Sequence, residues 1–514
     1  MGIRNAWREL WRPNPSVLKS KKRSFTGGEV NRLTAGWTTS VSSADTEIKG
    51  DIKRLRERSR DLIRNVDYCK NAMRAITDNV VGTSVRLQAQ IRQQRGGKLN
   101  QRLNDQVETA FKKWGHADSC DVSGKLSFDD ICRNAVTAWA SDGECFIRLI
   151  RGRKFGNSET PLAIQVCEAD MVDEDYQGKA PKKGWEWRMG VLVDEWHRPR
   201  QYAFYSRHPG DTLFINQPTA ERKHIFVDAK DVIHLATFSR PGQTRGIPWL
   251  SSSIQRMHHL QGYEQSEIIA RRVSSAQMAW ITTPEGELSG DDVVDEERVY
   301  DMSPGSIRYL APGEQIHVPN LDSPSGQFEP FVRAMIRALS AGIGVSYSTL
   351  SRDSSQTNYS SSRLDLLQDQ ESFKALQRQL REIVLEPIYK EWLELSVLGG
   401  SLNLPNYTTE PQRYQVARWM FKGFGWVDPM KEVQSNQLAV NAGFKLQSTV
   451  LSEQGLDLEE FLIARKNEIE LAESMGLSFE TTTKGASNET TSKVEETSNT
   501  EVDDGEPTRP GEES

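Results

Sequence analysis

The stretch RGIPWLSSSIQRMHHLQGYEQSEIIARRVSS, residues 245–275, predicts a long helix with an unusual surface. After Pro248 the pattern is helical to about residue 278, yet the apolar side chains form no single stripe. Polar and charged residues between His258 and Glu267 interrupt them. A helix that is polar on nearly all sides packs poorly in the core of a monomer. We therefore expect this helix to be half-buried on several faces against further copies of the same chain.

The composition indicates a chain with large polar surfaces. It has 514 residues, enough for two to four domains of roughly 100–200 residues each. Hydrophobic residues make up 37% of the chain, charged residues 26%, and the mean hydropathy is -0.61. A net charge of -6 argues against a globally basic nucleic-acid-binding protein. The sequence contains no run of ~18 apolar residues, so it predicts no membrane-spanning helix. The start MGIRNAWREL does not resemble a secretory signal.

The first half of the chain predicts an α+β domain. Apolar residues at helical spacing predict helices over 50–80, 100–114 and 127–141. From residue 144 the period changes to two, which indicates a mostly antiparallel sheet. The expected strands are 144–150, 162–167, 185–189, 191–193, 201–205, 224–227 and 232–236.

The second half alternates between helices and polar segments. Residues 279–325 predict a small β-rich insert around an acidic stretch, followed by a helix that ends near Gly344. The Ser-, Thr- and Asn-rich residues 346–362 predict a loop, and a strongly periodic helix follows, in which Pro387 should produce a kink. Two further helices are expected from Pro429 and from Asp457. The acidic, Ser- and Thr-rich end of the chain cannot bury enough apolar surface to fold.

The sequence contains no specific catalytic motif. It lacks G-x-x-x-x-G-K-[ST], G-x-S-x-G and H-E-x-x-H. The carboxylates at 291–297 could bind Mg²⁺, but a solvated acidic surface explains them better. Asp142-Gly143-Glu144 is interpreted as a turn into a strand, with catalytic carboxylates as the remote alternative. Adjacent His258 and His259 point about 100° apart on a helix and cannot chelate one metal together.

Two further residue sets allow a structural or a functional interpretation. The arginines between residues 54 and 64 could bind phosphate, or form an exposed helix face or a row of salt bridges between subunits. The five cysteines include no C-x-x-C pair and have no histidine at ligand spacing. We therefore expect buried free thiols in a reducing cytosol, and no metal or cofactor.

Six groups of segments occur in a characteristic order along residues 30–470. They are Asn79–Gly82 with Leu87-Gln88; Trp139–Arg148; Gly190–Asp194 with Tyr202–Tyr205; Arg245–Leu250 with Tyr263-Glu264 and Ala270-Arg271; Tyr347–Arg363; and Trp426–Glu432 with Gly443. Together they resemble the lambda-type family of phage portal proteins. The turn DEWHRP departs from that pattern, because Trp196 and His197 stand where a plain polar turn is usual. The insert at 279–325 matches loosely.

This resemblance implies an α+β portal fold with an α/β wing, a helical stem, a small β-rich clip and a helical crown. The implied divisions are a basic N-terminal arm at 1–29, the wing at 30–245, the first stem helix at 246–278, the clip at 279–325, the second stem helix at 326–345, the tunnel loop at 346–362, the long wing helix and its connection at 363–426, the crown at 427–475 and a disordered acidic tail at 476–514.

The resemblance also implies a non-enzymatic function. Portal proteins form a ring, most often of twelve copies, at one capsid vertex, through which viral DNA is packaged and ejected. The implied partners are further copies of the chain, double-stranded DNA, the terminase large subunit, the major capsid and scaffold proteins, and the head-completion and tail connector proteins. The implied location is the virion, and the host cytoplasm during assembly.

Two sets of candidate site residues follow from that assignment. The candidates for the DNA channel and tunnel loop are Arg333, Arg337, Arg352, Asp353, Ser354, Ser355, Gln356, Thr357, Asn358, Tyr359, Ser360 and Arg363. The candidates for docking the terminase are Asp291, Asp292, Asp295, Glu296 and Glu297. The arginines could instead form salt bridges between subunits. Two other functions remain open: a metal-dependent nuclease or hydrolase that uses the acidic residues at 291–297 or 142–144, and a protein–protein adaptor without DNA contact.

Overall fold

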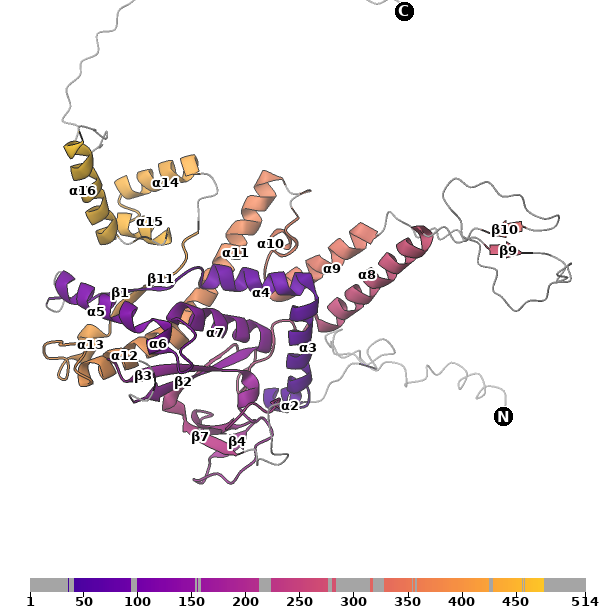
Figure 1. The fold of residues 1–514 in the computed structure, drawn as a ribbon, viewed down its shortest axis with the longest axis horizontal. Helices are drawn as coiled ribbons and strands as arrows, with labels where there is room; N and C mark the ends of the chain where they lie inside the picture. Colours follow the sequence, from indigo (N-terminus) through magenta and orange to yellow (C-terminus); the bar gives the residue numbers. More distant parts are fainter. Residues whose placement is uncertain are drawn as a thin grey trace, which may run out of the picture. The chain divides into compact units, whose positions relative to one another are not determined.

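The computed structural model is built from mixed helices and strands (Figure 1). It describes residues 41–93, 99–152, 159–211, 223–275, 280–282, 315–317, 328–353, 358–424, 429–454 and 458–475, and the single residues 36, 155, 355 and 456. The chain divides into one unit up to Gly455 and a second from Leu456.

Two helices replace the single helix predicted over residues 50–80. They are α3, Ile52–Asn65, and α4, Asp67–Val80, and a short helix α2, Ala44–Lys49, precedes them. Val66 separates α3 from α4 with extended backbone angles, φ -115° and ψ 114°. A β-branched residue favours such angles over the helix. The break lets α4 pack its apolar face against α7, while the cations Arg56 and Arg60 of α3 pair with carboxylates of later segments.

The two following helices confirm their predictions. Helix α5, Gln101–Trp114, is capped by the Asn100 side chain, which accepts a hydrogen bond from the Leu103 N–H. Helix α7, Phe128–Asp142, begins at a capping box of Ser127 and Asp130. It ends at Gly143, whose φ of 87° suits glycine. The short helix α6, Ala117–Cys120, lies between them in sequence.

The described strands pair in antiparallel fashion, as predicted, but in several sheets rather than one. Strands β2 (Glu144–Arg151), β3 (Leu162–Cys167) and β8 (Val232–Ala236) form one sheet in the order β3-β2-β8. Strands β4 (Glu186–Arg188), β5 (Val191–Val193), β6 (Pro199–Tyr205) and β7 (His224–Asp228) form a meander in sequence order. The 3₁₀ turns Ala169–Met171 and Ala229–Asp231 flank these strands.

A third sheet joins distant parts of the sequence. Strand β1 (Arg86–Ala89) pairs with β11 (Ala417–Met420), with Leu87 opposite Trp419. The short helix α13, Pro411–Tyr414, precedes β11. This pairing ties the segment after the long C-terminal helices to the N-terminal half, so the two halves of the first unit share one core.

The residues quoted first form the long helix α8, Ile254–Ser275. It begins later than the predicted residue 246, because residues 248–253 form turns in which Ser251 and Ser253 bond back to Pro248 and Leu250. Helix α9, Phe328–Ile343, runs beside α8 (Figure 1). Strands β9 (Trp280–Thr282) and β10 (Gln315–His317) pair between them in sequence, which agrees with the β-rich insert expected there.

The strongly periodic helix contains a π-helical turn. Helix α11, Tyr359–Leu380, passes through the π-helical residues Arg381–Leu385 into α12, Glu386–Leu398. The Glu386 N–H bonds to the Arg381 carbonyl five residues earlier. Pro387 lacks an N–H, and the wider turn before it lets the helix continue. The expected distortion at Pro387 therefore takes the form of a π-bulge.

The helices near the C-terminus fall in both units. In the first unit, α14 spans Pro429–Asn441 and α15 spans Gln447–Glu453. Gly443 follows α14 with a φ of 77°, so it ends that helix as predicted. In the second unit, α16 spans Leu458–Ser474.

The largest apolar core joins α4, α5, α7, β2 and α12. Its aromatic centre consists of Phe111, Trp114, Phe128, Tyr389, Trp392 and Trp419. A smaller core lies between the two larger sheets, where Phe146 packs edge-on against Tyr202 and Phe204. The larger core includes Ile254, Met257 and Leu260, so it holds the first turns of α8.

The cysteines behave as predicted. All five are free and buried. Burial raises the pKa of Cys69 and Cys120 to about 12, and that of Cys167 to about 11. Because the thiolate is the reactive form, these thiols are unreactive at neutral pH. Among the described residues, no helix has the length and apolar character needed to cross a membrane.

Candidate DNA-channel segment

Two of the candidate arginines lie on α9 and have partners within the chain. Arg333 pairs with Glu329 one helical turn earlier, and the Arg333 side chain is 16% exposed. The Arg337 guanidinium lies 5.5 Å from the ring centroid of Tyr347, a cation–π arrangement. For either arginine to bind a phosphate, it must share or exchange these contacts.

A buried carboxylate on α11 fixes the start of the predicted tunnel loop. Asp369 is buried and accepts hydrogen bonds from the Ser346 N–H at 2.8 Å, the Ser346 hydroxyl at 2.6 Å and the Thr349 hydroxyl at 2.7 Å. The Ser346 oxygen also caps helix α10, Tyr347–Ser351, by accepting from the Thr349 N–H. The predicted loop is therefore shorter than residues 346–362, because this carboxylate stabilises a helical turn at its beginning.

Helix α10 is also held against α4. The Asn71 side-chain amide donates to the carbonyls of Thr349 and Leu350 at 3.1 and 2.7 Å. The Arg352 Nε donates to the Asn71 Oδ1 at 3.1 Å, and Arg352 adopts a left-handed φ of 56°. Residues 346–352 are thus attached to α4 and α11. The prediction of a loop is therefore wrong for residues 347–351, which form helix α10.

Asp353 introduces a negative charge beside these arginines. It accepts hydrogen bonds from the Ser355 N–H at 3.0 Å and the Tyr347 hydroxyl at 3.1 Å. Hydrogen bonds from Ser355 and Tyr347, together with the nearby Arg333 charge, lower the pKa of Asp353. An ionised carboxylate repels phosphate, so the segment has mixed rather than purely positive charge.

The remaining candidates divide between the start of α11 and residues that the structure leaves undescribed. The Asn358 side chain caps α11 by accepting from the Ser361 N–H at 2.8 Å. Ser355 and Ser360 are exposed, and Arg363 is half-buried. Ser354, Gln356 and Thr357, the side chain of Tyr359, and the acidic candidates Asp291, Asp292, Asp295, Glu296 and Glu297 lie outside the described residues.

The sequence did not predict a buried charge cluster at the entry to α8. Glu144, fully buried, accepts from Arg56, from the Arg245 Nε at 2.7 Å, from the His234 Nε2 at 2.8 Å and from the Gly246 N–H at 2.9 Å. These charged partners outweigh the effect of burial and hold the pKa of Glu144 far below its usual range. Both oxygens of Glu144 therefore have partners within the chain, which favours the structural interpretation of Asp142-Gly143-Glu144.

Arg245 extends this cluster to the second sheet. Its guanidinium, fully buried, donates to the carbonyls of Val172, Met189 and Ala169. The backbone at Gly143 and Gly246 passes so closely that a Cβ on Gly143 would lie 2.1 Å from the Ile247 carbonyl carbon. In both segments a charged residue stands next to a glycine, Glu144 beside Gly143 and Arg245 beside Gly246, and this was the available sequence signal. It did not predict the contact, because no sequence rule indicates that two segments about 100 residues apart lie together.

The arginines of α3 serve the same cluster. Arg56 is fully buried against Glu144 and Glu174, and Arg60 pairs with Asp142 and Asp170. Neither a phosphate site nor an exposed helix face therefore describes these two residues. Arg60 also lies 3.6 Å from Glu168, which with Asp170 and His208 forms a cluster of potential metal ligands among the described residues. Arg60 already supplies the positive charge there.

A family comparison identifies the class of protein. A family model described as "Phage portal protein, lambda family" matches residues 30–377. The chain belongs to the lambda family of phage portal proteins. As a portal protein it is a structural component of the bacteriophage virion, at the head–tail connection. The match begins at the wing boundary expected from the sequence and extends into α11.

Curated portal proteins are similar over most of their length. The probable portal protein of Halomonas phage phiHAP-1 is 27% identical over 85% of this chain and 84% of its own. Portal protein B of Escherichia phage lambda is 23% identical over 88% and 89% of the two chains. A solved chain from the neck of an empty gene transfer agent particle, computed with C6 symmetry, is 12% identical, with a TM-score of 0.41 over 79% of this chain and 93% of that one.

Proposed function

We propose that this portal protein assembles into a closed ring, of twelve copies as is most common in the family, at one vertex of the capsid. The ring encloses the channel through which viral DNA is packaged and later ejected. In this proposal α8 and α9 are the stem, residues 279–325 the clip, residues 346–362 the tunnel segment and residues 427–475 the crown.

Unpacked apolar side chains on the proposed stem and wing helices carry this proposal. Ile268 and Ile269 on α8 are each 58% exposed, and Leu364 on α11 is 67% exposed. Leu366 and Leu367 beside it are also exposed, on different sides of the helix. Several large apolar side chains left exposed on the same helices indicate a surface that another molecule covers. A ring subunit has neighbours on two flanks, which accounts for apolar groups on more than one side of a helix.

The charge of the tunnel segment supports a channel that contacts DNA without retaining it. Each cation that neutralises a phosphate adds salt-dependent affinity, and strong affinity would oppose movement along the channel. Arg333, Arg337 and Arg352 each have a partner in the chain, and Asp353 adds a nearby negative charge. Together these groups allow short-lived phosphate contacts.

We further propose partners for the assembled ring. The acidic residues 291–297 dock the terminase large subunit, which supplies the motor, because this chain has no nucleotide-binding motif. Capsid and scaffold proteins contact the wing, and the head-completion and tail connector proteins bind after packaging. Assembly takes place in the host cytoplasm.

The test of the conduit function is a DNA-packaging assay with two variants of the tunnel segment. One variant lacks residues 354–357, and the control replaces the same four residues with alanine at unchanged length. Because Asp369 and Asn71 hold residues 346–352 from either side, both variants should form normal rings. We expect the shortened variant to lose most nuclease-protected DNA and the alanine variant to keep it. Unchanged packaging by the shortened variant would contradict a tunnel role and favour an adaptor without DNA contact.

A further inference from the structure

The turn between β5 and β6 presents a tryptophan to solvent on a rigid frame. Trp196 is 76% exposed, so it fills no pocket of its own chain. Beside it, the Asp194 Oδ1 accepts from the Trp196 and Arg198 N–H groups, each at 2.9 Å, and the Arg200 Nη2 donates to the Asp194 Oδ2 at 2.7 Å. His197 adopts a left-handed φ of 58°, which among residues other than glycine is found mainly at asparagine, aspartate and histidine.

An ordered turn that exposes a large aromatic side chain is suited to binding. Tryptophan and arginine dominate the binding energy of protein interfaces. A turn whose backbone is already held by hydrogen bonds loses less conformational freedom on binding than a flexible loop. The family resemblance does not account for this turn, because Trp196 and His197 are where this chain departs from the usual pattern.

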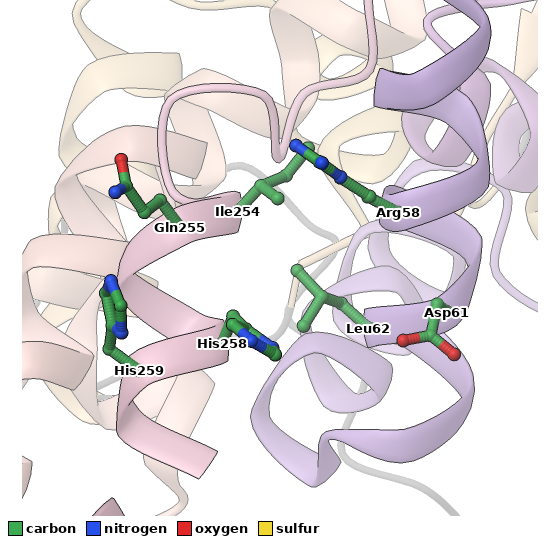
Figure 2. A pocket seen from close by; sticks show the side chains of 7 residues that line it. All are labelled: Arg58, Asp61, Leu62, Ile254, Gln255, His258 and His259. Atoms are coloured by element: carbon green, nitrogen blue, oxygen red, sulfur yellow. The ribbon is translucent and has the colours of Figure 1, made fainter. Parts of the chain in front are cut away.

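A pocket of about 620 Å³ lies between α3 and α8, at the junction of the proposed wing and stem. Its floor contains the buried Leu62 and Ile254, which point toward each other across the gap (Figure 2). Arg58 extends from α3 toward α8 above them. Its exposed polar rim is formed by Arg58, Asp61, Gln255, His258 and His259. The pocket therefore combines an apolar floor with one cation and one anion at its edge.

The turn and the pocket match each other: the turn exposes an apolar side chain and the pocket has an apolar floor, and each carries one acidic and one basic residue. The turn exposes the apolar Trp196 side chain, with the exposed acid Glu195 directly before it and the exposed base Arg198 two residues after it. The pocket is concave and apolar, and its charged rim residues are Arg58 and Asp61, one helical turn apart. Arg58 makes no ion pair with any described residue. A head-to-tail ring needs two different, mutually complementary surfaces on each subunit.

We propose that Trp196 of each subunit inserts into the α3–α8 pocket of a neighbouring copy. Glu195 then faces Arg58 of that copy, and Arg198 faces its Asp61. This inference rests on the proposed ring and names one of its contacts. The indole covers Leu62 and Ile254, and the contact joins the outer sheet of one subunit to the wing–stem junction of the next.

Disulfide trapping in the full-length chain tests the contact directly. The double variant Trp196→Cys with Gln255→Cys places one thiol at the tip of the turn and one at the rim of the pocket. The native cysteines are buried, so under mild oxidation the new thiols react alone. We expect a ladder of covalent oligomers on a non-reducing gel, and none from either single variant. Rings that are intact by electron microscopy but give no ladder would overturn this contact alone, whereas the absence of rings would overturn the ring itself.

A substitution series provides a second measurement. Trp196→Ala should shift the protein concentration at which half the subunits are in rings upward by on the order of 30-fold, the loss typical of an interface hot spot. Trp196→Phe should recover part of that loss, since a phenyl ring still fills the pocket. The control is Phe238→Ala, at another exposed aromatic residue, 50% exposed. Equal ring assembly by Trp196→Ala and Phe238→Ala would overturn the proposal, because it would show that Trp196 contributes no more to assembly than an exposed aromatic residue outside the proposed contact.

Discussion

Replacing Glu144 with glutamine tests the charge cluster at the entry to α8. The side chain keeps its shape but loses its charge, and both Arg56 and Arg245 remain fully buried. Each arginine loses its closest anion, since both donate to the same Glu144 oxygen. Removing one partner of a buried ion pair costs about 3–5 kcal/mol, because an uncompensated charge stays in the interior.

The loss of stability expected within that range depends on the partners that each arginine keeps. Arg245 keeps three backbone carbonyls, and Arg56 keeps Glu174 at 3.3 Å. We therefore expect about 3 kcal/mol, the lower end of the range. The assay is urea unfolding followed by near-UV circular dichroism at one fixed protein concentration, because assembly stabilises the folded subunit.

The matched control is Asp175→Asn. Asp175 also pairs with a cation of α3, Lys53, but the Asp175 and Lys53 side chains are 65% and 56% exposed. An exposed pair contributes about 0–1 kcal/mol. Equal small losses for Glu144→Gln and Asp175→Asn would refute the view that the buried cluster organises the entry to α8.

Three further predictions follow from the structure. The pKa of Glu144 is lower in the folded chain than its ordinary 4.5, so the stability that the Glu144 carboxylate contributes is present above pH 4.5 and is lost as the pH falls further. The difference in melting temperature between wild type and Glu144→Gln should therefore narrow below pH 4.5. Asp369→Asn should speed amide hydrogen exchange at Ser346 and Thr349 by roughly tenfold or more, because a hydrogen bond to a charged group contributes about 1.5–3 kcal/mol, whereas Asp365→Asn should leave it unchanged. A thiol reagent at neutral pH should label no native cysteine in the folded chain and all five after unfolding; rapid labelling before unfolding would contradict the burial of these thiols.

Local signals in the sequence accounted for many elements of the fold. The helices over 100–114 and 127–141 formed as predicted because their end signals are local: Asn100 and Ser127 cap the first turns, and Gly143 ends the second helix. Gly443 likewise ended α14 by its own backbone angle. The alternation from residue 144 correctly indicated antiparallel strands, because the period of two is a property of a single strand.

Long-range contacts account for the predictions that failed. Residues 50–80 keep helical spacing across Val66, yet the chain turns there. Both α3 and α4 pack against α7, but α3 also packs against α8, whereas α4 also packs against α10 and α11. Residues 347–351 lack a helical pattern, and they form α10 because Asp369, on another helix, holds Ser346 and Thr349. The arginines of α3 gave no sign that their counterions lie about 90–120 residues away in sequence, since Glu144 begins β2 and Glu174 lies in the turn after Ala169–Met171.

Native mass spectrometry of the purified full-length chain tests the central claim most directly. The unpacked Ile268, Ile269 and Leu364 side chains predict a single closed assembly whose mass is a whole multiple of 58.1 kDa, and negative-stain images of the same sample should show rings with a central channel. Because apolar contacts are not screened by salt as exposed ion pairs are, that assembly should stay intact as the salt concentration is varied. A stable monomer at every salt concentration, with no rings in the images, would contradict the account.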